Sequence, residues 1–132
     1  WVERSATYFV TICAASRGIN LFANDEMGKE LIRSAASHHF AGIWWLHLFL
    51  VMPDHIHALL AIAPNRQLGT TITAWKSYQT KYLQVAWQSG FFDHRIRGRA
   101  SHEAKAIYIR QNPVRAGLVA TPEAWPYSWT QQ

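Results

Sequence analysis

Residues 43–63, IWWLHLFLVMPDHIHALLAIA, hold two apolar runs with a proline between them. The runs, residues 43–51 and 55–63, each have the length of a buried β-strand. Pro53 closes the first run because it lacks a backbone donor and cannot continue a central strand. We predict two antiparallel strands that pair as neighbours across this turn.

The segments on either side of this hairpin add two strands and three helices. The expected strands are residues 7–14, TYFVTICA, and residues 91–96, both rich in β-branched or aromatic side chains. Helices are expected where apolar side chains recur every three or four residues or where a cap and a proline bound the segment. The expected helices are residues 24–40, 70–87 and 101–112.

These elements follow one another in the order β-α-β-β-α-β-α. Two strand–helix–strand halves predict an α+β fold with a ferredoxin-like antiparallel sheet and one additional C-terminal helix. Ser101 is the expected N-cap of that last helix, and Pro113 is expected to stop it. A length of 132 residues without repeats or linkers fits one domain, residues 1–132.

The composition favours a polyanionic partner. Thirteen Lys and Arg residues against eight Asp and Glu residues give a net charge of +5. Positive surfaces release counterions from phosphate backbones, so nucleic acid is the first candidate and an anionic membrane surface the second. Hydrophobic residues make up 49% of the chain, which supplies a core and argues against disorder.

The chain also carries signs of its compartment. Cys13 is the single cysteine, so no internal disulfide can form and a reducing cytoplasm is expected. The longest apolar stretch, residues 43–52, is too short to span a bilayer. The first residues, WVERSATYFV, lack the pattern of a secretory signal, and the chain begins without Met. We expect a cytoplasmic, nucleoid-associated protein with no membrane partner.

His55 and His57 are two residues apart in a predicted strand. Successive side chains of a strand point to opposite faces, so both imidazoles lie on one face, within reach of one metal ion. Taken alone, such a pair more often packs or hydrogen-bonds without a metal. His47 and His94 stand singly in apolar strands, and we expect them to be buried or hydrogen-bonded rather than to bind metal.

Two motifs identify a known family. MPDHIHALLAI, residues 52–62, resembles the HUH motif (histidine, hydrophobic residue, histidine) of single-tyrosine transposases. YIRQNPVRAGLV, residues 108–119, followed by WPYSW, residues 125–129, resembles the C-terminal signature of the REP-associated tyrosine transposases. The likeness extends over nearly the whole chain, from YFVTIC to WPYSW.

The resemblance implies the roles of several residues. Carried over position by position, it makes His55 and His57 ligands of a divalent metal, Mg²⁺ or Mn²⁺, and makes Tyr108 the nucleophile on the C-terminal helix. Tyr78 and Tyr82 are rival nucleophiles, four residues apart on a predicted helix. Their spacing matches its apolar stripe, so a role in the core or in DNA stacking fits them better.

The third metal ligand of this family is a polar side chain four residues after the nucleophile, which here is Asn112. Residues i and i+4 share a helical face, and an amide oxygen suits Mg²⁺ or Mn²⁺. Pro113 disfavours helical backbone at Asn112, however, and Gln111 is the alternative.

The resemblance further implies an enzyme. It predicts a metal-dependent single-stranded DNA endonuclease and strand transferase that acts through a 5′-phosphotyrosine intermediate. The DNA is expected to contain hairpins such as repetitive extragenic palindromes, with no small-molecule cofactor and a monomer rather than a homodimer. A rolling-circle replication initiator or relaxase is an alternative, although initiators tend to place a lysine at the position of Asn112. A non-catalytic hairpin-binding protein is a second alternative.

Cations that could hold DNA are spread over the second half of the chain. Arg95, Arg97 and Arg99 form the sharpest group, because in an extended segment all three would point one way and bind phosphates. A solvated, charged edge strand is the alternative reading of this group. The remaining candidates are Lys76, Lys81, Lys105, Arg110 and Arg115.

Overall fold

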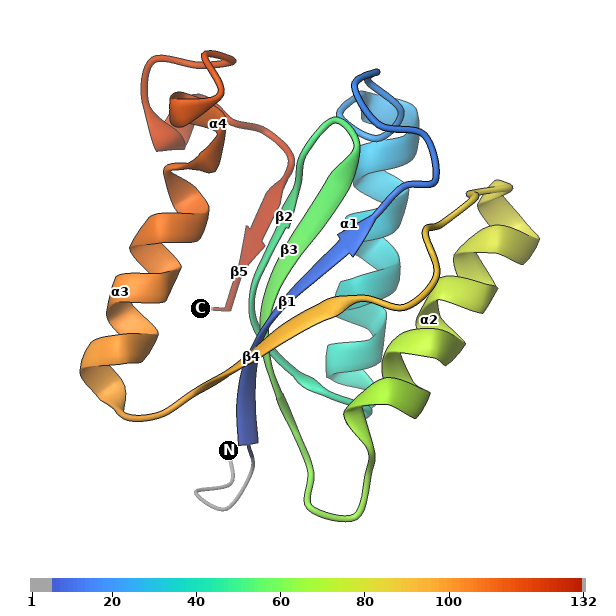
Figure 1. Cartoon of the computed structure of the whole chain (residues 1–132), viewed down its shortest axis with the longest axis vertical. Helices are drawn as coiled ribbons and strands as arrows, with labels where there is room; N and C mark the ends of the chain where they lie inside the picture. Colours follow the sequence, from blue (N-terminus) through green and yellow to red (C-terminus); the bar gives the residue numbers. More distant parts are fainter. Residues whose placement is uncertain (1–5, 132) are drawn as a thin grey trace.

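The computed structural model describes residues 6–131, which form one five-stranded antiparallel sheet with helices on both faces (Figure 1). The strand order is β4-β1-β3-β2-β5, so β3 is the central strand and lies between β1 and its hairpin partner β2. The strands are β1 (Ala6–Cys13), β2 (Trp45–Val51), β3 (His55–Ile62), β4 (Phe92–Ile96) and β5 (Ser128–Thr130).

Two helices cover one face of the sheet and a third covers the other (Figure 1). On the first face lie α1 (Asp25–Phe40) and α2 (Leu68–Leu83), and on the second lies α3 (Arg99–Arg110). A short helix α4 (Asn112–Arg115) and a 3-10 turn η1 (Pro122–Ala124) lead to β5. The predicted α+β fold is confirmed, with the ferredoxin-like strand order β4-β1-β3-β2. The edge strand β5 was not predicted.

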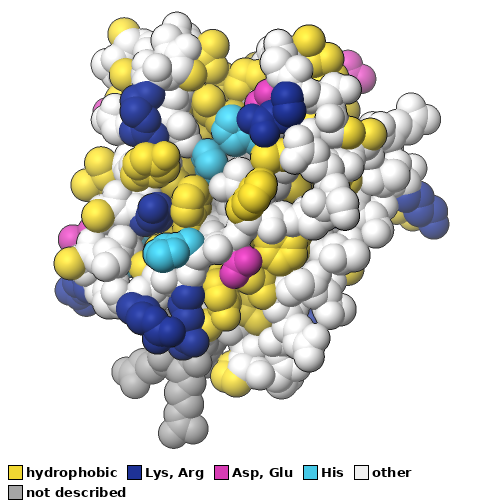
Figure 2. Space-filling model, viewed as in Figure 1, with side chains coloured by type: hydrophobic (Ala, Val, Ile, Leu, Met, Phe, Trp, Pro, Cys, Tyr) yellow, Lys and Arg dark blue, Asp and Glu magenta, His cyan; other side chains and the backbone are white. Residues whose placement is uncertain are grey.

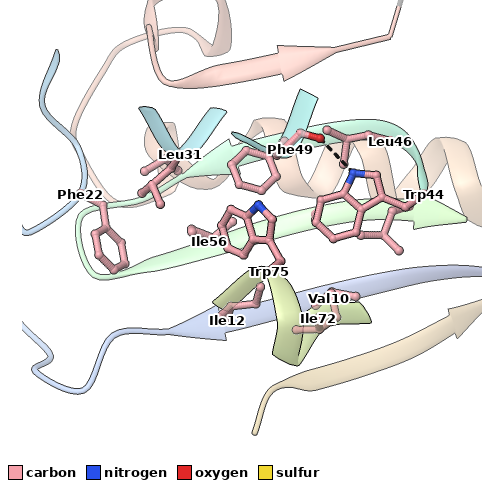
Figure 3. Packing of buried hydrophobic residues seen from close by; sticks show 14 of the residues in the cluster. Val10, Ile12, Phe22, Leu31, Trp44, Leu46, Phe49, Ile56, Ile72 and Trp75 are labelled. Carbon is pink, nitrogen blue, oxygen red and sulfur yellow. Dashed lines mark hydrogen bonds between the residues drawn. The ribbon is translucent and has the colours of Figure 1, made fainter. Parts of the chain in front are cut away.

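The larger core lies between the sheet and helices α1 and α2. Strand residues that alternate along β1 and β3, such as Val10, Ile12 and Ile56, pack there against Trp75 of α2 (Figure 3). The indole of Trp44 is also buried, and its Nε1 donates a hydrogen bond to the Ala35 carbonyl at 3.0 Å. Burial of aromatic and branched side chains on this face is the main stabilising contribution to the fold.

A smaller core lies on the opposite face, under α3. Leu50, Leu59 and Ile109 are its central members. A β-bulge at His47 shifts the register of β2, so Leu46 faces the larger core and Leu48 faces the smaller one. The bulge therefore lets β2 contribute leucines to both faces.

Helix α2 ends four residues earlier than predicted. Gln84 adopts a left-handed conformation with φ of 59° and stops the helix after Leu83. The chain then reverses, and Trp87 forms a bridge with Ala14 at the end of β1. Trp87 packs against the larger core from this loop, and its spacing imitates a continuing helical stripe.

Helix α3 also differs from its prediction. It begins at Arg99, with Gly98 rather than Ser101 at the cap position, and it ends at Arg110 rather than Asn112. Gly98 has φ of 85°, which a residue with a side chain rarely adopts. None of the helices within residues 6–131 is both long and apolar enough to cross a membrane.

Candidate active site

His55 and His57 lie on the face of β3 that α3 partly covers. Their ring centroids are 4.8 Å apart, as the alternation of the strand predicts. The Nδ1 atom of His55 is 2.8 Å from an Asp54 carboxylate oxygen, and Nδ1 of His57 is 3.0 Å from the Thr11 hydroxyl. Both rings are therefore oriented through Nδ1, which leaves each Nε2 free to bind a cation.

Asp54 is held in place from the loop that follows β1. Its carboxylate accepts hydrogen bonds from the Gly18 backbone N–H at 2.8 Å and from Arg17 Nε at 2.9 Å. Burial alone would raise the pKa of this carboxyl, but the bonds from Gly18, His55 and Arg17 outweigh it and hold the pKa well below its ordinary value. Asp54 therefore remains charged and fixes the ring of His55.

His57 is buried, with 8% of its surface exposed. Its pKa is lowered to about 3, mainly by burial and to a smaller extent by electrostatic interaction with His55, Arg115 and Lys105. The ring is consequently neutral at physiological pH. A neutral imidazole with a free Nε2 is the form that binds metal ions.

Tyr108 is close to this histidine pair, across the ring of Phe9. The Phe9 centroid lies 5.2 Å from that of His57 and 6.3 Å from that of Tyr108. Tyr108 is 48% exposed, so its phenol is accessible from outside. The Lys105 ammonium lies 4.9 Å from the centre of the Tyr108 ring and 4.8 Å from that of Phe9.

Arg115 contacts Tyr108 in two ways. Its guanidinium carbon lies 4.3 Å from the centre of the Tyr108 ring, and its Nη2 donates a hydrogen bond to the Tyr108 carbonyl at 2.8 Å. The break between α3 and α4 at Gln111 brings Arg115 back over the end of α3. The nucleophile candidate is therefore close to two positive charges, those of Lys105 and Arg115.

The two candidates for the third metal ligand lie in different surroundings. Asn112 opens α4, and its Nδ2 is buried with no hydrogen-bond partner among the described residues. Gln111 lines a cavity of about 350 Å³ between α3, η1 and β5. Among residues 6–131 no group of three or more His, Cys, Asp and Glu side chains could hold a metal. A site at His55 and His57 would thus need a ligand of another type, such as an amide.

The predicted DNA-binding cations fall into separate groups, and Figure 2 shows Lys and Arg side chains gathered near histidines on one face. Lys105 and Arg115 adjoin Tyr108. Lys76 lies on α2 beyond the opposite face of the sheet, where its Nζ donates to the carbonyls of Gln88 and Gly90. Lys81 is on the same helix, Arg110 lines the cavity with Gln111, and Arg95, Arg97 and Arg99 line another cavity.

Other expectations about aromatic residues and histidines need correction. Tyr78 and Tyr82 are exposed on α2, with ring centroids 4.4 Å apart, so they are not in the core. His94 is exposed rather than buried. His47 is half-buried and packs against His102 of α3, with ring centroids 4.7 Å apart.

Phe9 and Thr11 of β1 were not recognised from the sequence as site residues. Thr11 pairs with His57 in the β1–β3 register, and Phe9 is two residues before it on the same face. The period-two pattern of TYFVTICA would have put both on one face. Only the register places that face beside the histidines.

Comparisons with known proteins agree with the motifs. A "Putative REP-associated tyrosine transposase" from Haemophilus influenzae is 30% identical over 95 residues, which cover 59% of this chain. The match covers 54% of that relative, so the chain spans about half the length of the curated protein. No family model matches.

Two solved structures share the fold. A REP-associated tyrosine transposase bound to a REP hairpin has a TM-score of 0.81 at 21% identity, over 97% of this chain and 78% of that one. A putative transposase from Deinococcus radiodurans has a TM-score of 0.58 at 14% identity, over 84% and 93%. These matches in sequence and fold confirm that the chain is similar to the REP-associated tyrosine transposases.

Proposed function

We propose that this protein is a REP-associated tyrosine transposase that cleaves and rejoins single-stranded DNA next to a hairpin. Tyr108 is its nucleophile and forms a 5′-phosphotyrosine intermediate. The observation that carries the proposal is the approach of Tyr108 to His57 across Phe9, with Lys105 and Arg115 beside both. An exposed phenol, the neutral imidazole of His57 and two cations suit attack on a phosphodiester.

The reaction exchanges one phosphate ester for another. The Tyr108 oxygen forms a bond to the phosphorus, and the bond from phosphorus to the 3′ oxygen breaks. The phenol loses its proton to solvent, and the departing 3′ oxygen takes up a proton. Lys105 and Arg115 stabilise the negative charge that collects on the phenol and the phosphate. Attack by another 3′-hydroxyl on the phosphotyrosine reverses the sequence and joins a new strand, with no nucleotide cofactor.

The residues present fit a divalent metal, Mg²⁺ or Mn²⁺. His55 and His57 would hold it through their free Nε2 atoms, since both Nδ1 atoms are already engaged. Asn112 is the preferred third ligand, because an amide oxygen suits either ion and no hydrogen bond from Nδ2 fixes this amide in another orientation. When bound, the metal would polarise the scissile phosphate.

The expected substrate is DNA that contains a hairpin. The solved relative with the higher TM-score is bound to a REP hairpin, and the net charge of +5 suits a polyanion. Exposed Phe92 and the half-buried ring of Phe9 offer surfaces on which unpaired bases stack. The proposal also includes that the protein acts as a monomer and that it is cytoplasmic and associated with the nucleoid.

The decisive experiment is a search for the covalent intermediate. The full chain is mixed with Mn²⁺ and a hairpin oligonucleotide that carries a single-stranded arm, labelled at either the 5′ or the 3′ end. A 5′-phosphotyrosine retains the 3′ label on the protein and releases the 5′ label as a shorter strand. The adduct should disappear in Tyr108→Phe. An adduct that survives this substitution, or no adduct with any hairpin, would contradict the proposed nucleophile.

A second measurement separates the metal site from DNA binding. His57→Ala should abolish the adduct and weaken Mn²⁺ binding, measured by calorimetry, while hairpin affinity changes only a few fold. His94→Ala, an exposed histidine on β4, is the matched control. If His57→Ala loses hairpin binding but stays folded, the histidines serve recognition, and a non-catalytic hairpin-binding protein becomes the better assignment.

A further inference from the structure

Three arginines surround one cavity at the beginning of α3. Arg95 lies in β4, Arg97 follows the strand, and Arg99 is the first residue of the helix. The cavity has a volume of about 690 Å³, and Thr7 of β1 also lines it. The turn at Gly98, with φ of 85°, directs the chain from strand to helix around this hollow. An arrangement predicted as one extended edge is therefore a concave site.

The three guanidinium groups have no ion-pair partner within the part of the chain that the structure describes. Arg17 and Arg33, by contrast, each bind a carboxylate at 2.9 Å or less. Glu103 lies on the cavity wall, so three positive charges face one negative charge. Planar guanidinium groups match the geometry of phosphate oxygens, and an unpaired cluster around a hollow suits a phosphate group.

The cavity is separated from Tyr108 by nearly the whole length of α3. Arg99 and Tyr108 are nine residues apart on the helix, which corresponds to about 13.5 Å along its axis. A stacked strand advances about 3.4 Å per nucleotide and an extended one advances further, so this distance corresponds to at most about four nucleotides. Lys105 lies between the two ends and adds a positive charge along the way. Lys and Arg side chains occur at several levels of this face (Figure 2).

We propose that the cavity of Arg95, Arg97 and Arg99 binds a second backbone phosphate of the strand that Tyr108 cleaves. This inference rests on the proposed function and adds to it a fixed spacing between the bound phosphate and the scissile phosphate. The bound phosphate lies within about four nucleotides of the scissile one, counted from the helix length. Holding it selects which phosphate reaches Tyr108, so the site determines the position of cleavage along the strand.

The test is a scan with neutral phosphates. Each phosphate of the single-stranded arm is replaced in turn by a methylphosphonate, and hairpin binding is measured by fluorescence anisotropy with Tyr108→Phe, which leaves the oligonucleotide intact. We expect one non-scissile position where the replacement weakens binding about tenfold, the effect of one charge-assisted contact. In an Arg97→Gln/Arg99→Gln variant of the same protein, replacement at that position should have no further effect.

Arg33→Gln, on α1 across the sheet, is the matched control. In this variant, replacement of the sensitive phosphate should still weaken binding about tenfold. Circular dichroism confirms that each variant is folded. If no phosphate depends on the arginines, or if the dependent one lies more than about four nucleotides from the cleaved bond, the second site is overturned. A dependent phosphate without any covalent adduct would support the site while contradicting the proposed enzyme, so the two failures are distinguishable.

Discussion

At the level of single residues, Arg115 makes the most specific contacts with the candidate nucleophile. It stacks on the Tyr108 ring at 4.3 Å and donates to the Tyr108 carbonyl at 2.8 Å. The ring contact places positive charge next to a phenol that must become an anion, and the hydrogen bond ties α4 to the end of α3. Arg115 therefore both orients and activates Tyr108 in the proposed reaction.

We predict that Arg115→Ala slows adduct formation with bound hairpin by roughly tenfold to a hundredfold, because a charge-assisted contact contributes about 1.5–3 kcal/mol. Single-turnover rates at saturating DNA measure this effect. Arg115→Lys should recover part of the rate, since it keeps the charge but not the planar stacking. Arg33→Ala is the control for loss of an arginine elsewhere. A wild-type rate for Arg115→Ala would contradict this role.

A second residue-level prediction concerns acid stability. The pKa of His47 is lowered to about 4, mainly by burial and to a smaller extent by the neighbouring His102 and His39. In the unfolded chain His47 takes up a proton near the ordinary histidine pKa of about 6.5. In the folded protein it takes up the proton only at a lower pH. The contribution of His47 to the free energy of unfolding is therefore fully present above pH 6.5 and is lost as the pH falls toward 4.

His47→Gln should reduce this loss by on the order of 1 kcal/mol, after allowance for the partial exposure of the ring. The measurement is the difference in unfolding free energy between pH 7 and pH 4.5, from urea titrations. Exposed His94→Gln should leave that difference unchanged. Equal pH dependence in wild type and His47→Gln would show that His47 does not contribute to the acid-induced loss of stability.

At the level of elements, hydrogen bonds hold the C-terminal segment against α1 and β2. The Tyr127 hydroxyl donates to Asp25 at 3.0 Å, and the Trp125 indole donates to the Val51 carbonyl at 3.0 Å. Gly28 of α1 permits this packing, because a Cβ atom there would lie 2.8 Å from the Tyr127 ring and 2.9 Å from the Phe22 carbonyl oxygen. The packing of the WPYSW segment therefore requires a glycine in the first turn of α1.

Gly28→Ala should consequently destabilise the protein by about 1–3 kcal/mol, despite the better helix propensity of alanine. Gly69→Ala, in α2, is the matched control because nothing lies within 4 Å of its added Cβ. That change should be neutral or stabilising by up to about 1 kcal/mol. Urea unfolding midpoints compare the two, and similar effects at both positions would contradict the packing argument.

At the level of the whole molecule, the sheet separates two faces with different roles. Helices α1 and α2 close the larger core, whereas the other face carries the histidine pair and, on α3, the exposed Tyr108. Lys105 lies on the latter face, beside Tyr108. Lys81 lies on α2, next to Tyr82, although both lysines were predicted to bind DNA.

The structure now predicts different effects for these two lysines. Lys105→Gln should weaken hairpin binding and lower the slope of log affinity against log salt by about 1, the change expected for one lost phosphate contact. Lys81→Gln should have a smaller effect on both quantities. Anisotropy titrations at several salt concentrations measure them, and a larger effect of Lys81→Gln would place the DNA on the α2 face.

Local patterns in the sequence were sufficient for the order of the first seven elements and for the placement of the two histidines on one face of a strand. Apolar runs bounded by Pro53 predicted β2 and β3, and period-two alternation placed His55 and His57 on one face. These features depend only on residues that are close together in the sequence, so a short stretch of sequence is enough to predict them. The metal-binding and nucleophilic roles of the site residues stay predictions until the experiments above are done.

Only the tertiary structure brought Phe9, His57 and Tyr108 together, because their approach depends on the β1–β3 register and on how α3 packs over the sheet. The same packing buried His57 and lowered its pKa, and it curved the segment of Arg95, Arg97 and Arg99 around a cavity. Periodicity says which face a side chain occupies. It does not say which distant segment covers that face, since that contact is decided by the folding of the whole chain.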